Sequence, residues 1–433
     1  MSDDGTIESL SRSSSNSSVA SLDSSDKEYE VCTKANGIRI QSHAQDSFLL
    51  RKHLCNINTC AGLKIDKVEG VSGYKEVVPG NILLGRKLGS GTYGDCFLIK
   101  QPSVSSALPE QHSLSSPWIA CKVFIQDWDA SIDKEEAFKE VRYWQQNISH
   151  ELTISRIFND CKYLVTLHGT ASSVGSWMAP SGVLFTSEAY TCNLHQLNRW
   201  VSDNLIYVSV YWSAMVYPMW HIAQALAHMH RHRCCHLDVK PGNVLLRWNP
   251  HSDVVDTTPG HMRQFQGALC DFSISRVFAN CSSSHSPSNY DSGVIGVITT
   301  PELTPPECLV GDCSQSFKTD VWQFGELLSS CFYPDYPCIT SQLRKMKTKT
   351  GNSCYHRVME HVWKSRFSPR PESVFDWKHP KNPFAIALTR AQGIDSAFAD
   401  LMQLCLTADP DKRPTMDQVL KHRAFDRCRS DAE

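Results

Sequence analysis

One short polar segment constrains this chain more than any other part of the sequence. Residues 236–243 read His-Leu-Asp-Val-Lys-Pro-Gly-Asn. A carboxylate at Asp238, an ammonium at Lys240 and a carboxamide at Asn243 therefore share one short loop. Such a joint arrangement rarely arises by chance, so we interpret it as a reaction centre.

A second carboxylate, that of Asp271, comes directly after the apolar residues 268–270, at the end of an expected strand. Phosphoryl transfer needs a group that orients a hydroxyl, a cation near the transferred phosphate, and oxygen ligands for Mg²⁺. The loop at 236–243 and Asp271 together offer these groups. The sequence therefore favours phosphoryl-transfer chemistry.

A glycine-rich segment at 89–94, Gly-Ser-Gly-Thr-Tyr-Gly, lies between expected strands at 82–84 and 96–99. We expect a hairpin turn whose backbone N–H groups can approach a phosphate, with an ordinary glycine-rich hairpin as the alternative. Lys122 lies within the apolar strand expected at 118–124. It needs a carboxylate or phosphate partner, unless it points to solvent from an edge strand.

Together these features resemble the eukaryotic protein kinases of the serine/threonine type. The segment 89–94 is similar to the loop that covers ATP in that family, and Lys122 in Ala120-Cys-Lys is similar to the lysine that holds the α- and β-phosphates. The segments 236–243 and 271–273 are similar to the catalytic loop and the metal-binding motif.

The resemblance implies an α+β, bilobal protein kinase fold with a small β-rich N-lobe and a larger α-helical C-lobe. Outside the domain, residues 1–30 hold eleven serines, many beside acids, and cannot bury enough apolar surface to fold. The expected divisions are a disordered Ser-rich tail (1–45), an N-terminal extension (46–79), the kinase domain (80–425; N-lobe 80–188, C-lobe 193–425) and a C-terminal tail (426–433).

The resemblance also implies the role of each site residue. Asp238 would orient the substrate hydroxyl, with Lys240 and Thr300 in the catalytic set. Asn243 and Asp271 would bind Mg²⁺, with Mn²⁺ as an alternative. The residues expected to contact ATP are Leu88, Gly89, Ser90, Gly91, Thr92, Tyr93, Gly94, Cys96, Ala120, Lys122, Glu151, Ser187, Glu188, Tyr190 and Cys270.

Two glutamates compete as the helical partner of Lys122. Glu140 has a spacing from Lys122 that is common in the family, whereas Glu151 precedes the strand expected at 163–167 by a spacing that is also common. We prefer Glu151, because the loop before this helix tolerates insertions better than the packed segment after it. An extra helix is then expected at 133–147, and a further strand at 183–187.

Later segments extend the resemblance. Residues 300–307 are similar to the end of the activation segment, and 320–325 to the central buried helix of the large lobe. Residues 409–415 are similar to the late motif whose arginine pairs with the activation-segment glutamate, which predicts an ion pair between Glu307 and Arg413.

Three residues depart from common usage or allow two interpretations. Leu237 replaces the arginine that commonly binds a phosphate on the activation segment, so we expect no dependence on that contact. Ser273 replaces a glycine, which predicts a stiffer metal-binding motif. Cys270 is interpreted as a small buried hydrophobe, with a reactive thiol as the alternative.

Composition excludes other classes. The 43 Lys+Arg and 45 Asp+Glu give a net charge of −2, which argues against a nucleic-acid partner. The stretch 204–230 lacks these charged residues but contains Pro218 and three histidines, so we expect a buried helix and no membrane span. We expect no secretory signal, so the 18 cysteines favour free thiols in the cytoplasm and/or nucleus. No Cys-x-x-Cys pair occurs, and the spacing by two in the His/Cys tract at 228–236 spreads its side chains around a helix, which argues against a zinc site.

The expected function is transfer of the γ-phosphate of Mg-ATP to Ser/Thr hydroxyls of protein substrates. Two alternatives remain: a pseudokinase scaffold that binds nucleotide without efficient transfer, and a small-molecule kinase with the same fold. The pattern leaves the substrate and the oligomeric state open.

Overall fold

A computed structural model provides the fold of this 433-residue chain. The residues that it describes are 29–34, 37–42, 45–46, 48–50, 52–53, 84–91, 94–100, 118–123, 146, 149–167, 169–172, 183–248, 265–278, 303–309, 316–334 and 383–431.

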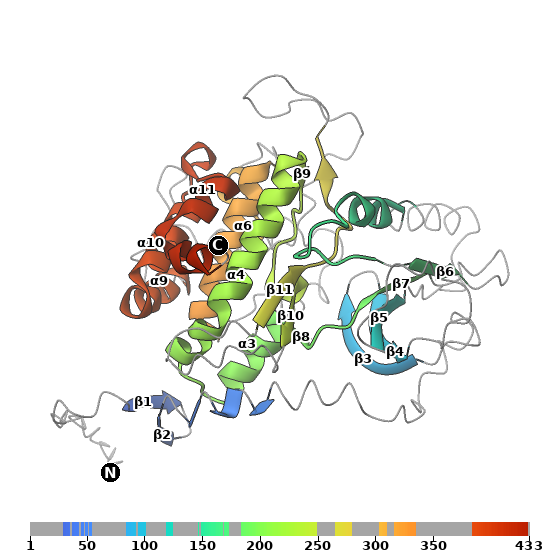
Figure 1. The fold of residues 1–433 in the computed structure, drawn as a ribbon. Helices are drawn as coiled ribbons and strands as arrows, with labels where there is room; N and C mark the ends of the chain where they lie inside the picture. Colours follow the sequence, from blue (N-terminus) through green and yellow to red (C-terminus); the bar gives the residue numbers. More distant parts are fainter. Residues whose placement is uncertain are drawn as a thin grey trace, which may run out of the picture.

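The smaller lobe is built on one antiparallel sheet of five strands in the order β3-β4-β5-β7-β6 (Figure 1). Phe97, Leu98 and Cys121 are buried on it. The glycine segment forms the tip of the β3–β4 hairpin, with Gly91 opposite Gly94, which confirms the expected hairpin. The strands are β3 (Leu84–Gly91), β4 (Gly94–Lys100), β5 (Trp118–Val123), β6 (Gly169–Ser172) and β7 (Val183–Glu188).

The prediction of a strand at 163–167 is wrong. The regular strand in this part of the chain is β6, at Gly169–Ser172. In the 163–167 segment, only Leu164 makes a bridge, to Leu269. The Val165 N–H donates to the Leu269 carbonyl at 2.9 Å, so this segment pairs with the larger lobe. Ser155, at the end of the helical residues 149–157, accepts from the Leu167 N–H at 3.0 Å and fastens the helix to this segment. The extra helix expected at 133–147 lies outside the described residues except for Gln146.

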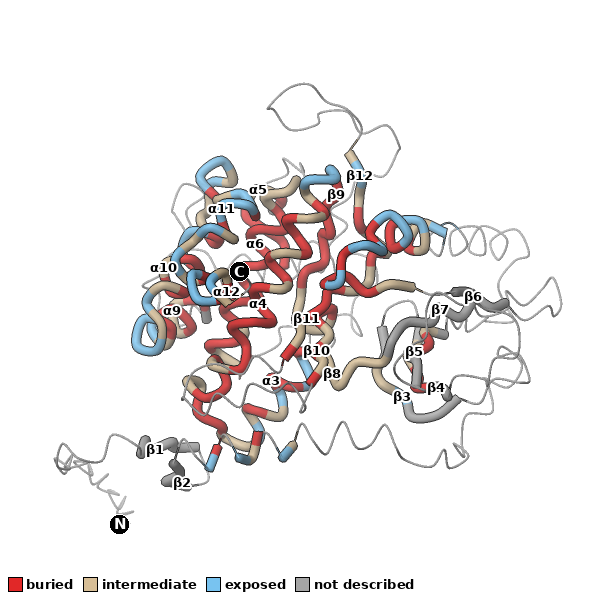
Figure 2. The backbone as a smooth tube through the Cα atoms, viewed as in Figure 1, coloured by how far each residue is buried: buried red, intermediate tan, exposed pale blue. Residues whose placement is uncertain are grey.

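The larger lobe is mainly helical, which confirms the expected α+β architecture. Figure 2 shows α4 and α6 as largely buried elements at its centre, with α9, α10 and α11 on one side of them. Its helices are α3 (Leu194–Asp203), α4 (Val208–Arg231), α5 (Pro306–Leu309), α6 (Phe317–Phe332), α9 (Pro383–Ile394), α10 (Ser396–Cys405), α11 (Met416–Lys421) and α12 (Asp426–Ser430), with 3₁₀ turns η3 (Pro241–Asn243), η6 (Pro410–Lys412) and η7 (Arg423–Phe425).

Two small sheets carry the polar loop of this lobe. One has the strand order β11-β10-β8 and the other pairs β12 with β9. The chain enters the lobe through 189–191, between β7 and β8. The strands are β8 (Cys192–Asn193), β9 (Cys234–Cys235), β10 (Val244–Trp248), β11 (Phe265–Leu269) and β12 (Arg276–Val277).

Most of the uncharged stretch 204–230 lies in the buried helix α4. This helix tolerates Pro218 beside Gly267 of β11, where an added Cβ would lie 2.9 Å from the Pro218 carbonyl oxygen. Because Gly267 has no Cβ, helix α4 and strand β11 can pack closely at this point. Among the described helices, none combines the length and the apolar content needed to cross a bilayer.

The expected tails contain ordered structure. Within 1–45, residues of alternating β propensity form an antiparallel hairpin of β1 (Tyr29–Lys34) and β2 (Gly37–Ser42), so the expectation of disorder is corrected there. The expected C-terminal tail begins with α12, whose Cys428 is buried in the core.

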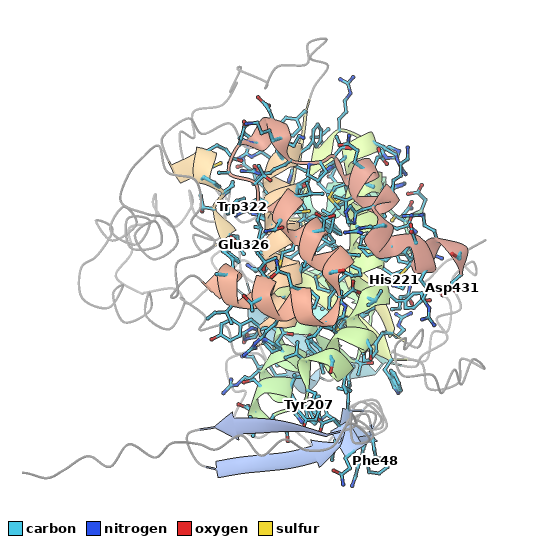
Figure 3. All side chains as sticks on the ribbon, turned by 90° about the vertical axis from the view of Figure 1, so that its left-hand side faces the viewer. Phe48, Tyr207, His221, Trp322, Glu326 and Asp431 are labelled. Carbon is cyan, nitrogen blue, oxygen red and sulfur yellow. The ribbon has the colours of Figure 1, made fainter. Side chains whose placement is uncertain are left out.

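Part of the N-terminal extension packs against the larger lobe. Leu50 is fully buried in its core, and the ring of His53 stacks on Trp200 with centroids 3.9 Å apart. The Asp46 carboxylate accepts from the N–H of Tyr207 at 2.7 Å; Tyr207 is the residue before α4 and provides no side-chain cap of its own. Figure 3 shows Tyr207 and Phe48 at the same end of the molecule. Asp46 therefore caps the longest described helix from outside the expected domain boundary.

Replacing Asp46 with Ala is expected to lower the free energy of unfolding by about 1–3 kcal/mol, because a buried N–H loses its acceptor at a helix N-terminus. Chemical denaturation of the full chain measures this change. Phe48→Ala is the matched control, since Phe48 is 65% exposed and its loss should change stability by less than about 0.5 kcal/mol. Equal effects of the two substitutions would contradict the capping role.

Candidate active site

Lys122 connects the two lobes through carboxylates. On β5 it lies opposite Cys96 of β4. Its Nζ is 3.0 Å and 3.2 Å from the carboxylate oxygens of Glu151 and 3.6 Å from Asp271 Oδ1. The structure thus pairs Lys122 with Glu151, whereas Glu140 lies outside the described residues.

The three groups also fix one another's charge. Burial alone would lower the pKa of Lys122, but Asp271 and Glu151 outweigh it and raise the pKa. Burial raises the pKa of Glu151, an effect that Lys122 opposes. Burial would also raise the pKa of Asp271, yet the charge of Lys122 and a hydrogen bond from the Ser273 side chain lower this pKa below its usual value. A lysine cation beside an ionised Asp271 is the state that follows.

The stability contributed by Asp271 should therefore depend on pH. A carboxyl group whose pKa is lowered on folding stabilises the fold above its unfolded pKa and loses this contribution as the pH falls through the folded value. The difference in unfolding free energy between wild type and Asp271→Asn should be constant above about pH 5 and shrink below pH 3.8. Urea denaturation at several pH values measures it, and a difference that grows on acidification would contradict the assignment.

Asp271 takes up a backbone conformation that few non-glycine residues adopt. It follows β11 with a φ of 70°, in the left-handed region. Ser273, which replaces a glycine, is not among the described non-glycine residues with positive φ. The expected stiffening at Ser273 therefore has no counterpart in backbone strain at that residue.

The loop after β9 gathers the other polar groups around Asp238. Lys240 Nζ lies 2.7 Å from Asp238 Oδ2, and Asn243 Nδ2 donates to the same oxygen and to the Asp238 carbonyl, both at 2.9 Å. Asp238 itself is buried. The three residues that the sequence placed on one loop are thus in direct contact.

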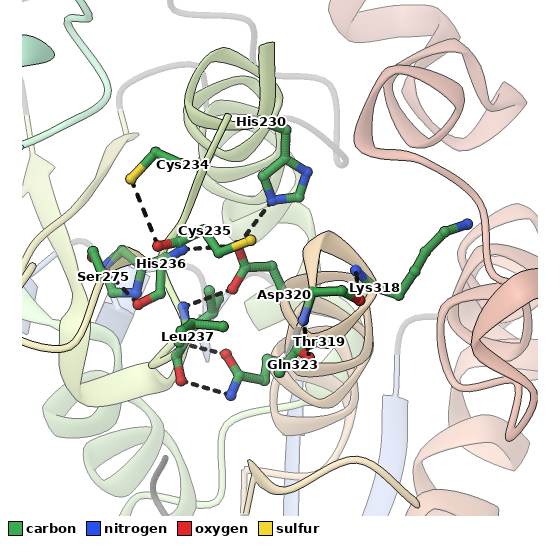
Figure 4. Close-up of polar contacts among 12 residues, drawn as sticks. His230, Cys234, Cys235, His236, Leu237, Ser275, Lys318, Thr319, Asp320 and Gln323 are labelled. Atoms are coloured by element: carbon green, nitrogen blue, oxygen red, sulfur yellow. Dashed lines mark hydrogen bonds and ion pairs between the residues drawn. The ribbon is translucent and has the colours of Figure 1, made fainter. Parts of the chain in front are cut away.

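A buried carboxylate on α6 holds the backbone of this loop (Figure 4). Asp320 Oδ2 accepts from the His236 N–H at 2.9 Å, and Oδ1 accepts from the Leu237 N–H at 2.7 Å. Gln323 adds two contacts: its amide donates to the Leu237 carbonyl and accepts from the Val239 N–H. These bonds restrain Leu237, whose φ is 69°.

The same carboxylate belongs to a cluster with metal-ligand chemistry. Donor atoms of His230, Cys235 and Asp320 lie within 4.8 Å of one another. However, Asp320 already pairs with His230 Nε2 at 2.8 Å besides its two backbone donors. Burial raises the pKa of the Cys235 thiol, which keeps it protonated. We therefore interpret the cluster as a structural hydrogen-bond network.

Asn243 and Asp271 fit a hard cation. The amide nitrogen of Asn243 is used toward Asp238, which leaves the amide oxygen for a ligand. Asp271 has a lowered pKa and is an ionised oxygen donor at neutral pH. Oxygen donors of this type suit Mg²⁺.

Other residues that were expected to contact ATP lie on the strands of the smaller lobe, in the connection between the lobes and after β11. Ala120 is opposite Ser187 across β5 and β7. Cys270 is partly buried, and desolvation raises the pKa of its thiol well above the usual value, which supports a neutral thiol over the reactive alternative. Thr92, Tyr93 and Thr300 lie outside the described residues.

The predicted ion pair between Glu307 and Arg413 is confirmed. Two guanidinium nitrogens of Arg413 donate to the Glu307 carboxylate at 2.8 Å and 2.7 Å. The pair joins α5, at the end of the activation segment, to the turn after α10.

Sequence reasoning missed the residues that position the site. Asp320 and Gln323 were placed in the central helix without a role, although their spacing of three puts both on one helical face. Gln196 of α3, whose side chain reaches the smaller lobe, matches the Asn-x-x-Gln pattern of a helix cap, but that pattern gives no sign of its contact with the smaller lobe.

Comparison with known proteins agrees with this geometry. The family profile of the protein kinase domain matches residues 83–425. "Cyclin-dependent kinase-like 4" of Mus musculus is 24% identical over 80% of this chain and 83% of its own length. "Cyclin-dependent kinase-like 1" of Caenorhabditis elegans is 23% identical over 78% of this chain and 79% of its own.

Other relatives match a shorter part. "MAPK/MAK/MRK overlapping kinase" of Mus musculus is 26% identical over 48% of this chain, and the match spans 42% of that protein. The kinase profile nevertheless covers most of the chain, from the first strand of the small lobe to the last turns of the large one. On this evidence, the chain belongs to the protein kinase family.

Proposed function

We propose that this chain is an ATP- and Mg²⁺-dependent serine/threonine protein kinase that transfers the γ-phosphate of ATP to protein substrates. One observation carries the proposal. Lys122 of the small lobe lies 3.6 Å from Asp271 of the large lobe while it pairs with Glu151, so a cation from one lobe meets a carboxylate from the other.

The site residues divide the work by their chemistry. Lys122 holds the α- and β-phosphates, and Glu151 fixes the position of its ammonium. The Asp238 carboxylate orients the substrate hydroxyl and accepts its proton, and Lys240 steadies the transferred phosphoryl group. Catalysis is then mainly positioning and electrostatic stabilisation.

Asn243 and Asp271 are the residues that would hold the metal. When bound, Mg²⁺ neutralises charge on the β- and γ-phosphates. Lys122 balances the negative charge of Asp271 at the same place.

Serine and threonine are the proposed acceptors. Lys240 and Thr300 resemble serine/threonine kinases, and a relative from Dictyostelium discoideum is named "Probable serine/threonine-protein kinase glkA", with 23% identity over 67% of this chain. We place the enzyme in the cytoplasm, the nucleus or both, because the cysteines that the structure describes are free thiols, which suits a reducing compartment.

Transfer of labelled γ-phosphate from Mg-ATP to a general acceptor protein tests the proposal. We expect transfer by the wild type and its loss in Asp238→Asn, which keeps the size of the side chain but removes the proton acceptor. Equal labelling by the two proteins would rule out the assignment of Asp238. Acceptor phosphoamino-acid analysis identifies the hydroxyl.

A nucleotide-binding scaffold is the outcome that competes with this proposal. It predicts a thermal shift with ATP and Mg²⁺ but no transfer, including no autophosphorylation. The intact pair between Lys122 and Glu151 favours the enzyme, because a scaffold does not need this ion pair.

A further inference from the structure

The first strand of the small lobe has a bulge where the glycine segment begins. In the β3–β4 pairing, Lys87 is opposite Phe97 and Gly89 is opposite Cys96, and the register shifts between Lys87 and Gly89. Leu88 therefore falls between paired positions, and a bulge of this kind turns a backbone group away from the ladder.

A side chain from the larger lobe donates a hydrogen bond to the carbonyl group of Leu88. Gln196 Nε2 donates to the Leu88 carbonyl oxygen at 2.9 Å, across 108 positions of sequence. Gln196 lies in the first turn of α3, the helix that begins directly after β8. The bond thus joins the base of the glycine segment to the large lobe, beside the connection between the lobes.

The Gln196 side chain is held in place by a second, separate contact. Its Oε1 accepts from the Asn193 N–H at 3.0 Å, while Asn193 Oδ1 accepts from the Gln196 N–H at 2.8 Å, a reciprocal capping box. Asn193 is in turn paired with Leu245 in the sheet of the large lobe. Because Oε1 is held by the Asn193 N–H, Nε2 is directed toward Leu88. The amide oxygen of Gln196 thus contacts the start of α3, and its amide nitrogen contacts the smaller lobe.

We propose that Gln196 is a positioning residue that latches the glycine segment over the nucleotide and slows nucleotide release. The inference rests on the proposed function, since it assumes that ATP binds beneath the segment 89–94. Separation of the lobes beside the connection between them must break the bond between Nε2 and the Leu88 carbonyl. A ligand held beneath the segment leaves only after this bond opens.

Three substitutions separate the latch from the helix cap. Gln196→Glu keeps an acceptor for the Asn193 N–H but has no donor for Leu88. Gln196→Lys has a donor that can reach Leu88 but no acceptor for Asn193. Gln196→Met is neutral, of similar length, and has neither.

Stopped-flow dissociation of a fluorescent ADP with Mg²⁺ measures the latch directly. We expect Gln196→Glu and Gln196→Met to release the nucleotide about 3- to 10-fold faster than wild type, the range for one lost neutral hydrogen bond. Gln196→Lys should release it within about 2-fold of the wild-type rate. In transfer assays the KM for ATP should rise in the first two variants with kcat kept or raised, because release of product is not slowed.

The outcomes separate the inference from the proposed function. If the wild type fails to bind the nucleotide, the proposed function fails and the latch with it. If the wild type binds and all three variants release at its rate, only the latch is overturned. Release that is fast in Gln196→Lys and normal in Gln196→Glu would assign the effect to the helix cap and also overturn it. Thermal unfolding of each variant checks that the fold is kept.

Discussion

Replacing Asp320 with Asn is expected to destabilise the protein by about 3 kcal/mol and to lower phosphate transfer about 100-fold. The carboxylate is fully buried and accepts from the N–H groups of His236 and Leu237. An amide presents one NH₂ group to these donors, so a buried N–H loses its partner. The backbone before Asp238 is then released from its restrained conformation, and the carboxylate loses its alignment.

Asp417→Asn is the matched control for Asp320→Asn. It makes the same chemical change at a carboxylate that is half exposed and pairs with Arg231. Surface pairs of this kind contribute about 0–1 kcal/mol, so stability and transfer should stay close to wild type. Equal losses in the two variants, measured by denaturation and by initial transfer rates, would show that Asp320 does not support the loop.

Replacing Arg413 with Met is expected to lower the free energy of unfolding by about 3–5 kcal/mol, because removal of one partner leaves a largely buried carboxylate unpaired. The Arg413 side chain is fully buried, and the Glu307 side chain is 13% exposed. The same guanidinium also donates to the carbonyls of Thr407, Lys318 and Ala408.

Two further variants make the prediction about Arg413 specific. Arg413→Lys keeps the charge but not the planar fork, so it should recover only part of the loss. Arg423→Met removes an arginine that is 63% exposed and lies 3.4 Å from Asp400, and should cost less than about 1 kcal/mol. A melting temperature for Arg413→Met as high as that for Arg423→Met would contradict the buried-pair argument.

Much of the candidate site could be predicted because its chemistry depends on which residue types occur close together in the sequence. Asp238, Lys240 and Asn243 share one loop, so their proximity followed from the chain itself. The partner of Lys122 needed a choice between two glutamates, and the structure pairs it with Glu151. The spacing used for that choice assumed a strand at 163–167, which is in fact paired with β11 through a single bridge.

The missed contacts join backbone groups to distant side chains. Asp46 caps α4, and Gln196 reaches the Leu88 carbonyl. A backbone carbonyl or N–H is present at almost every residue, so the sequence carries no mark of which one is left without a ladder or helix partner. In the structure, the bulge at Leu88 and the uncapped helix start at Tyr207 identify the two backbone groups that need a side-chain partner.

By itself the sequence determined the family, the two-lobe order of strands and helices, and the polar residues of the centre, because each depends on side-chain identity at short spacing. The tertiary structure decided which segments outside residues 80–425 pack on the larger lobe, which backbone groups accept or donate to distant side chains, and which contacts join the lobes. Those properties depend on how segments far apart in the chain are placed in the folded protein. The 2.9 Å hydrogen bond between Gln196 and Leu88, for example, forms only when both segments have reached their folded positions.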